Sequence, residues 1–137
     1  VVKMNLENRI NFLGHLNNRE LRTWYAKCTL FVFPSTVETF GNPLVEAMAS
    51  GAPIVCSRAA AMPEVLGDSG VYFDPNSIES MHGTIFKVLK EKKLRSELGL
   101  RARKRAKLYS WNETKELTVN SLISAALSSR QIDKLHK

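Results

Sequence analysis

The sequence predicts an α/β fold built on a parallel sheet with helices on both faces. Short apolar runs that suit β-strands alternate with segments of helical period through much of the chain. Two of these runs, 30–33 and 54–56, are apolar at every position, which is typical of strands covered on both faces. Parallel strands need crossover connections, and the helical segments between the runs supply them.

The expected elements begin with strands at four places: 10–13, 29–33, 53–56 and 71–73. The first helix is expected at about 19–27, behind an N-cap at Asn17 or Asn18. The residues expected on its core-facing stripe are Leu21, Trp24 and Tyr25. Residues 1–8 precede the first strand closely, so we interpret them as the tail of an upstream segment.

The second half of the chain has helical period. A brief helix is expected from Pro63 to the residue before Gly67, another behind a cap at Asn76 or Ser77, and another at about 93–108. A last helix follows Trp111, with an expected apolar side made of Leu117, Leu122, Ile123 and Leu127. These elements form one expected domain over 1–128, followed by a polar, frayed tail over 129–137.

The composition is that of an ordinary globular protein. The 137 residues are 44% hydrophobic and 24% charged, which allows one domain with a core. No apolar run approaches the ~18 residues that cross a bilayer, and the first residues lack a secretory signal pattern, so a cytoplasmic location is expected. Cys28 and Cys56 have no metal-ligand spacing and are expected to be core residues without a disulfide.

The net charge of +7 is unevenly distributed, because residues 82–137 hold 14 of the 20 basic and 5 of the 13 acidic side chains. Such asymmetry raises the question of nucleic acid or a membrane surface. The most basic run, 101–107, falls on an expected helix without interleaved aromatic residues. We interpret it as a solvated helix face. Contact with an anionic membrane surface or a missing partner domain is the second interpretation, and nucleic-acid binding is not expected.

One stretch, 34–57, organises the chain. It opens after the second expected strand, and Asn42 is the expected N-cap of a helix with Pro43 at its first position. The helix is apolar nearly all round and is therefore expected to be buried. Gly51 suits the residue just past its end, and Pro53 prevents continuation. With the strand that follows, the stretch makes a β-loop-α-β unit.

Two carboxylates interrupt this apolar pattern, Glu38 in the loop and Glu46 about one turn into the helix. Burying a carboxylate without a partner is costly, so Glu46 is expected to have a strong hydrogen-bonding role. Between them, the helix start offers free N–H groups and the positive end of the dipole, and Gly41 allows close backbone approach. A phosphate over 41–44, flanked by carboxylates that accept from sugar hydroxyls, describes a nucleotide-sugar site. The equally weighted alternative is that Glu46 pairs with an Arg or Lys and that Glu38 is solvated.

The motif Glu38-x7-Glu46, with Phe40-Gly41 and the run EAMASGAPIV at 46–55, resembles the signature of the retaining group 1 glycosyltransferases (glycosyltransferase family 4, GT-B fold). Flanking segments agree in order: Phe12-x-Gly14, Leu21, Tyr25 and Pro34-Ser35 before the motif, and Pro63-Glu64-Val65, Gly70-x-Tyr72-Phe73-x-Pro75 and Ser110-Trp111 after it. The resemblance covers about residues 9–127. It implies a Rossmann-like parallel sheet flanked by helices, as most of the C-terminal, donor-binding domain of a GT-B glycosyltransferase.

The resemblance also implies site roles. Glu46 would accept hydrogen bonds from the ribose hydroxyls, since two carboxylate oxygens suit a vicinal diol. Glu38 would lie by the transferred sugar and is the implied catalytic residue. The implied donor-binding set is Glu38, Thr39, Phe40, Gly41, Asn42, Pro43, Leu44 and Glu46. Because Pro43 has no N–H, Leu44 is expected to supply much of the donation to the diphosphate. The loop at His15 and Leu16 would hold the nucleotide base.

The implied chemistry is transfer of a hexose-type sugar, with retention, from a nucleotide-diphosphate sugar to a glycan, lipid or small-molecule acceptor. No cofactor and no metal are expected, because the helix dipole and basic residues would neutralise the charge of the diphosphate. The family's diphosphate-neutralising cations would lie upstream of Arg9, and an N-terminal acceptor domain is missing. The isolated fragment is therefore expected to be inactive, with that domain as its partner and with peripheral membrane contact as a further option.

Other chemistries fit the sequence less well. Paired carboxylates occur in glycosidases, but neither Glu has an evident apolar pocket and the helix start would be unused. The scattered histidines His15, His82 and His136 do not predict a metal site. The rival from another class is a non-catalytic basic α/β module that binds nucleotide, nucleic acid or membrane. The presence of Glu38 and Glu46 disfavours such a module, because carboxylates repel a phosphate ligand.

Overall fold

A computed structural model describes residues 2–135 of the chain, with side chains for 3–127. Its strands are β1 (Phe31–Phe33), β2 (Ile54–Ser57) and β3 (Val71–Phe73), which form one parallel sheet in the order β1-β2-β3. The expected parallel α/β architecture is confirmed. The strands expected at 29–33 and 53–56 are present with boundaries shifted by one or two residues.

The helices follow the expected order along the chain. They are η1 (Val2–Met4), η2 (Glu7–Arg9), α1 (Asn18–Lys27), α2 (Asn42–Ser50), α3 (Met62–Leu66), α4 (Ile78–Lys90), α5 (Lys92–Ala106) and α6 (Trp111–Leu135). The last helix runs through most of the stretch where we expected a frayed tail. Residues 136 and 137 of that expected tail lie outside the described residues.

Helices cover both faces of the sheet, as the continuous apolar strands predicted. All four residues of β2 are buried, and successive side chains of a strand point to opposite faces. Ile54 and Cys56 belong to one core cluster, with apolar residues of α1, α2, α3 and α5. Val55 belongs to a second cluster, with residues of β3, α4 and α5. The two clusters form the core on the two sides of the sheet.

The prediction of a strand at 10–13 is wrong. These residues follow η2 without regular structure, and the side chain of Phe12 is 84% exposed. Within the described residues, β1 pairs with β2 along one edge and has no strand on its other edge. Residues 10–13 do not pair with that open edge, and a run without paired backbone hydrogen bonds is not a strand.

Helix α1 begins where it was predicted to begin, but fewer of its residues are buried than predicted. The side chain of Asn17 accepts from the N–H groups of Arg19 and Glu20 at 3.1 and 3.0 Å, and Glu20 completes the capping box. Tyr25 is buried, whereas Trp24, expected on the same stripe, is 50% exposed. Adjacent helix residues point about 100° apart, so a helix that packs along one narrow stripe covers only one of them.

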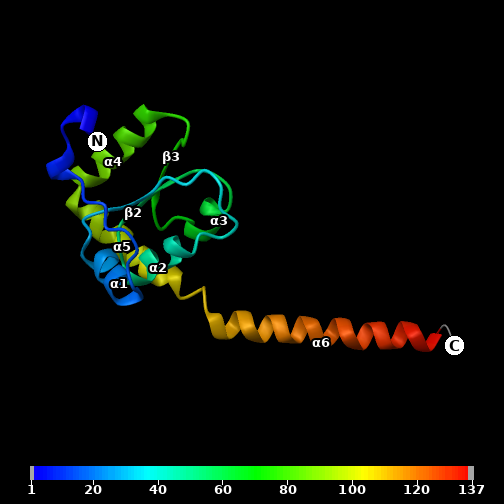
Figure 1. Ribbon diagram of the computed structural model, residues 1–137. Helices are drawn as coiled ribbons and strands as arrows, with labels where there is room; N and C mark the ends of the chain where they lie inside the picture. The colour runs from blue at the N-terminus through cyan, green and yellow to red at the C-terminus, as the bar shows by residue number, and fades with distance from the viewer. Residues whose placement is uncertain (1, 136–137) are drawn as a thin grey trace.

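Helix α6 extends away from the rest of the described chain (Figure 1). Its expected apolar side is exposed within the described residues, at Leu117, Leu122, Ile123 and Leu127. The helix is therefore present as predicted, but its apolar side does not pack against the domain core.

Helix α5 fixes the C-terminal end of α2. Gly51, just past that end, adopts the left-handed conformation with φ 74°. A Cβ placed on Gly99 of α5 would lie 2.6 Å from the carbonyl oxygen of Gly51, so only glycine permits this approach. Arg103 Nη2 donates to the carbonyl of Ser50 at 3.1 Å, which places a positive charge at the negative end of the α2 dipole.

The interpretation of the basic run on α5 as a solvated face holds in part: Arg101, Arg103, Lys104 and Lys107 are exposed, but two of its arginines also bond the backbone of neighbouring helices. Besides Arg103, Arg105 Nε donates to the carbonyl of Val65 at 2.6 Å at the end of α3. The hydroxyl of Tyr109 donates to the same carbonyl at 2.9 Å. Arg101, in contrast, is exposed and forms an ion pair with Glu97 one turn earlier, at 4.0 Å.

We predict that Gly99→Ala destabilises the protein although alanine is the better helix former. The added Cβ would press on the Gly51 carbonyl, and the cost of about 1–3 kcal/mol exceeds the gain in helix propensity. Gly83→Ala is the matched control in α4, because nothing lies within 4 Å of a Cβ there. It should stabilise by about 0.5–1 kcal/mol. Urea unfolding of both variants tests the difference, and equal stabilisation by both would contradict the close approach of α2 and α5.

Candidate functional site

The turn into α2 is built on a glycine. Gly41 is buried and takes the N-cap position with φ 83° and ψ 60°, a left-handed conformation that favours glycine. The prediction of Asn42 as N-cap is wrong: Asn42 is the first helical residue, Pro43 follows it, and no side chain caps the helix. The glycine turn leaves both of these residues exposed at the helix start.

The backbone donors at this helix start differ from the expected ones. The N–H of Leu44 donates to the carbonyl of Gly41 at 2.9 Å, so the expectation that Leu44 supplies the diphosphate donor is wrong. Pro43 has no N–H. Since the first N–H groups of a helix have no intrahelical acceptor, the first-turn donor left for a ligand is the N–H of Asn42, supported by the helix dipole.

Glu38 lies in the loop between β1 and this turn and is half-buried. Its Oε1 accepts from the hydroxyl of Ser35 at 3.1 Å. The hydroxyl of Ser57, at the end of β2, donates to the carbonyl of Ser35 and ties the loop to the carboxyl end of the sheet. Glu38 therefore has a protein partner, and the alternative of a merely solvated side chain does not apply.

Thr39 and Phe40 lie between Glu38 and the glycine turn, and both are exposed. The ring of Phe40 meets that of Tyr109 edge to face, with centroids 5.5 Å apart. This contact joins the motif loop to the segment that connects α5 and α6.

Glu46 is exposed, contrary to the expectation that it is buried. The core face of α2 is made of Leu44, Ala47 and Met48, all at 0% exposure, and Glu46 lies at the edge of that face. It lines one hollow together with Tyr25 of α1. Burial raises the pKa of Tyr25 to about 12, and the nearby Glu46 carboxylate adds to that rise.

The alternative of a salt bridge to Glu46 does not hold. Within the described residues, the Lys or Arg ion pair is Arg101–Glu97, far along the chain on α5. The Glu46 carboxylate is therefore exposed to solvent and makes no ion pair with a cation of the described residues.

Two hollows meet at Glu46. The α1 hollow, of about 680 Å³, lies between α1 and α2 and is lined by Asn18, Leu21, Arg22, Tyr25, Ala26, Glu46, Ala49, Ser50 and Trp111. The α6 hollow, of about 490 Å³, is lined by Phe40, Asn42, Val45, Glu46, Leu108, Tyr109, Ser110, Trp111, Glu113, Thr114 and Leu117. Glu46 and Trp111 line both hollows, and Asn42, at the helix start, lines the α6 hollow.

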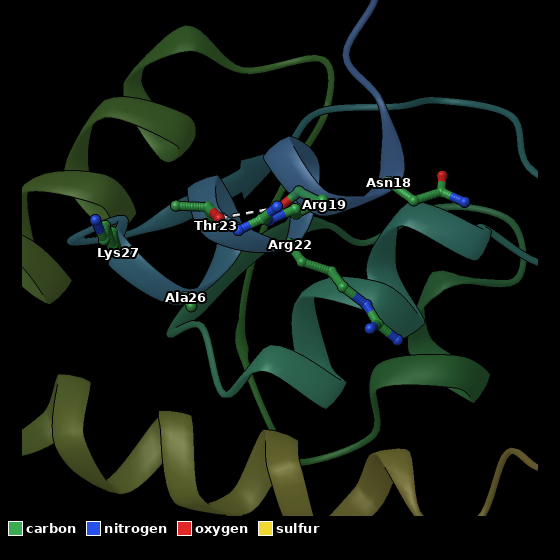
Figure 2. Close-up of a pocket in the computed structure, with 6 residues that line it drawn as sticks. All are labelled: Asn18, Arg19, Arg22, Thr23, Ala26 and Lys27. Atoms are coloured by element: carbon green, nitrogen blue, oxygen red, sulfur yellow. Dashed lines mark hydrogen bonds between the residues drawn. The ribbon is translucent and has the colours of Figure 1, made fainter.

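A third hollow, of about 570 Å³, lies on the outer face of α1 and is lined by that helix alone (Figure 2). It contains no carboxylate and no glycine turn, and three of its residues are the basic Arg19, Arg22 and Lys27. Figure 2 shows Asn18 and Arg22 extending to one side of the helix, and these two residues also line the α1 hollow. We interpret the rest of this face as solvated helix surface.

The structure does not bring the expected base-binding loop into these hollows. His15 is exposed and Leu16 half-buried ahead of the cap of α1, and neither lines the hollows at Glu46. The first turns of α1 take that place, through Asn18 and Leu21. Sequence reasoning gave no site role to Tyr25 or Trp111. The one sequence signal for Tyr25 was its polar hydroxyl, on a helix stripe that is otherwise apolar.

Two further features bear on chemistry. Within the described residues, no three His, Cys, Asp or Glu side chains gather as metal ligands would, and no helix there combines the length and apolar character of a membrane span. Cys56 is buried and free, and burial raises the pKa of its thiol to about 11. The thiol is therefore inert near neutral pH.

Comparison with known proteins agrees with the motif. The family description "Glycosyl transferases group 1" matches residues 2–105. O-antigen chain mannosyltransferase B of Escherichia coli is 36% identical over 115 residues, which are 84% of this chain and 30% of that protein.

Solved structures share the fold. Sucrose-phosphate synthase from Thermosynechococcus elongatus superposes with a TM-score of 0.82 at 25% identity, over 93% of this chain and 33% of that one. HepE from Anabaena, in complex with UDP and glucose, gives a TM-score of 0.74 at 27% identity, over 93% of this chain and 34% of that one. The expected fold class, part of a GT-B glycosyltransferase, is confirmed. The chain spans about a third of the length of these proteins, and it belongs to the family of group 1 glycosyl transferases.

Proposed function

We propose that the chain is the donor-binding part of a retaining glycosyltransferase of family 4. The enzyme would transfer a hexose-type sugar from a nucleotide-diphosphate sugar to a glycan, lipid or small-molecule acceptor. The observation that carries the proposal is the placement of Glu46 on the exposed edge of α2, beside two hollows and about one turn from the open helix start at Asn42. A carboxylate and a helix start at this separation suit a ribose and its diphosphate.

Each part of the site has a role in this proposal. The Glu46 carboxylate accepts from the ribose hydroxyls. The diphosphate meets the N–H of Asn42 and the positive end of the α2 dipole, with the turn at Gly41 allowing close approach. Glu38, half-buried at the carboxyl end of the sheet, accepts from hydroxyls of the transferred sugar and is the catalytic residue. Thr39 and Phe40 line the turn that faces the same sugar.

The reaction itself needs parts outside this chain. The bond from the anomeric carbon to the diphosphate breaks, the acceptor oxygen bonds to the same face of that carbon, and the proton of the acceptor hydroxyl passes to the leaving diphosphate oxygen. We propose that the leaving charge is balanced by the α2 dipole and by cations from the rest of the protein, without a metal or other cofactor. The acceptor is held by a separate N-terminal domain, so the isolated chain binds nucleotide weakly and transfers nothing.

Relatives support the choice of ligand. HepE from Anabaena, with the same fold over 93% of this chain, is described in complex with UDP and glucose. The Escherichia coli relative at 36% identity is an O-antigen chain mannosyltransferase. Both descriptions fit a nucleotide-sugar donor. A cytoplasmic location, with contact to an anionic membrane surface, remains part of the proposal.

A second candidate is the non-catalytic basic module, favoured by the net charge of +7. Within 101–107, however, Arg103 and Arg105 donate to backbone carbonyls of α2 and α3. Only part of the basic run is therefore available to an external anion, which weakens the charge argument for this candidate.

The first prediction separates the two carboxylates. Glu46→Ala should weaken binding of free nucleoside diphosphate by about 1.5–3 kcal/mol, because charge-assisted hydrogen bonds to the ribose are lost. Glu38→Ala should leave nucleotide binding nearly unchanged and sharply lower transfer, because its partner is the sugar at the reacting centre. Calorimetry and product formation in the full-length protein measure the two effects.

Glu116→Ala is the matched control for these variants, since it removes an exposed glutamate from α6, away from the motif. It should bind and transfer like the wild type. If Glu46→Ala and Glu38→Ala also behave like the wild type, the donor-site assignment is wrong.

The second prediction concerns stereochemistry. The glycosidic bond made by the full-length protein should have the same anomeric configuration as the nucleotide-sugar donor. Proton coupling constants of the first-formed product, measured by NMR before any anomeric exchange, give the configuration directly. A product with the opposite anomeric configuration to the donor would contradict the assignment to a retaining family.

The third prediction tests the second candidate. If only part of the basic run is open to solvent, the protein should bind nucleic acid weakly, without sequence preference, and with a steep loss as salt rises. Filter binding or fluorescence anisotropy over a salt series measures this. Sub-micromolar affinity that survives ~0.2 M salt would favour the nucleic-acid module instead.

A further inference from the structure

Helix α2 has one stripe of side chains that are not covered by the core, formed by the exposed Asn42, Glu46 and Ala49 and the half-buried Val45 and Ser50. Residues three and four apart lie on the same face of a helix, so these side chains follow one another along α2. Asn42 and Val45 line the α6 hollow and not the α1 hollow. Ala49 and Ser50 line the α1 hollow and not the α6 hollow, whereas Glu46 lines both. The stripe therefore leads from the helix start, past the carboxylate, into the α1 hollow.

This order gives a bound nucleotide a direction. The phosphate chain and the base are attached on either side of the ribose ring oxygen, and the two ring hydroxyls lie on the opposite edge of the sugar. With those hydroxyls at Glu46 and the diphosphate at Asn42, the base extends past Glu46, away from the helix start. At the α-helical rise, Asn42, Glu46 and Ser50 follow one another at intervals of about 6 Å along the axis. The base then lies over Ala49 and Ser50, whose short side chains leave room for it.

The opposite wall of the α1 hollow carries two polar side chains that can contact the edge of a base. Asn18 and Arg22 lie one turn apart on α1, are exposed, and extend to the same side of the helix (Figure 2). Within the described residues, neither side chain is engaged in a hydrogen bond or an ion pair. The hydroxyl of Ser50, on the α2 wall, already donates to the carbonyl of Glu46 at 3.0 Å. Asn18 and Arg22 are therefore the groups of these two walls that are available to a base.

We propose that the α1 hollow is the base pocket of the donor site and that it selects guanine, so that the donor is a guanosine-diphosphate sugar. The inference rests on the proposed function, which places the ribose at Glu46. The guanidinium of Arg22 donates through a planar fork that matches two adjacent acceptors of guanine, O6 and N7. Asn18 Oδ1 accepts from the N–H groups on the neighbouring edge of the same base.

The other bases match these two side chains less well. Adenine has an amino donor beside N7, and this donor opposes the N–H groups of Arg22. In uracil the two carbonyl acceptors are separated by an N–H donor, so the fork reaches one of them at a time. Cytosine has two adjacent acceptors, but its single ring fills less of a hollow of about 680 Å³. Guanine combines the paired acceptors with the larger ring system.

Arg19 provides a matched control on the same helix. It is exposed like Arg22 and carries the same charge, and it lines the outer hollow of Figure 2 without lining the α1 hollow. Arg19→Ala therefore removes an equal charge from α1 and leaves the proposed pocket intact. Arg22→Lys is the second comparison, because lysine keeps the positive charge but lacks the planar fork.

The test measures binding of GDP, ADP, UDP, CDP and 7-deaza-GDP to the full-length protein by calorimetry. Wild type should bind GDP at least about tenfold more tightly than the three other natural diphosphates. It should also bind GDP more tightly than 7-deaza-GDP, which lacks the N7 acceptor. Arg22→Ala and Arg22→Lys should lose most of both preferences, and Arg19→Ala should keep them. Asn18→Ala should lower the preference for GDP by a smaller factor, because only neutral hydrogen bonds are lost.

The outcomes separate the inference from the proposed function. If no nucleoside diphosphate binds, or if Glu46→Ala binds all of them like the wild type, the proposed function fails and the inference fails with it. If binding depends on Glu46 but Arg22→Ala and Arg19→Ala change the affinities alike, the base pocket is overturned and the proposed function stands. A wild-type preference for another base, or a preference for GDP that survives in Arg22→Lys, would overturn the selection of guanine by the Arg22 fork.

Discussion

The packing of α2 is the constraint on which the candidate site depends. Leu44, Ala47 and Met48 are fully buried against the core, and helix geometry then places Glu46 at the edge of that buried face. The helix ends against α5, where the missing side chain of Gly99 lets the two backbones approach. One set of core contacts therefore fixes the direction of the helix, the location of its open start and the height of the carboxylate above the sheet.

The two ends of α2 use the helix dipole in complementary ways. The positive end lies open at Asn42, behind a turn without a side-chain cap, and suits an anionic ligand. The negative end receives a donated hydrogen bond from Arg103 to Ser50. A second arginine, Arg105, does the same for α3 at Val65. Part of the positive charge that suggests an external anion thus serves the fold, so net charge alone is a weak guide to the ligand of this protein.

Local signals account for what the sequence could predict. The parallel sheet, the glycine stop of α2 and the carboxylate pair depend on residues close together in the chain, and the structure contains each of them. Features that depend on distant neighbours could not be predicted. The run 10–13 has the composition of a strand but is paired with no strand in the described chain. Trp24 is a large apolar residue, yet no other described element covers its side of α1. The hollow shared by Tyr25 and Glu46 brings together two helices that are separated by β1 in the chain. The satisfied N–H of Leu44 depends on the turn conformation of Gly41. Neither has a signature in spacing.

The donor-site assignment of Glu46 and the α2 helix start is tested most directly by a crystal structure of the full-length protein with a bound nucleoside diphosphate sugar. The account predicts both carboxylate oxygens of Glu46 within hydrogen-bonding distance of the ribose hydroxyls. It also predicts the diphosphate at the N–H of Asn42, and Glu38 beside the sugar. A nucleotide bound with its ribose away from Glu46, or with its diphosphate on the basic face of α5, would contradict it.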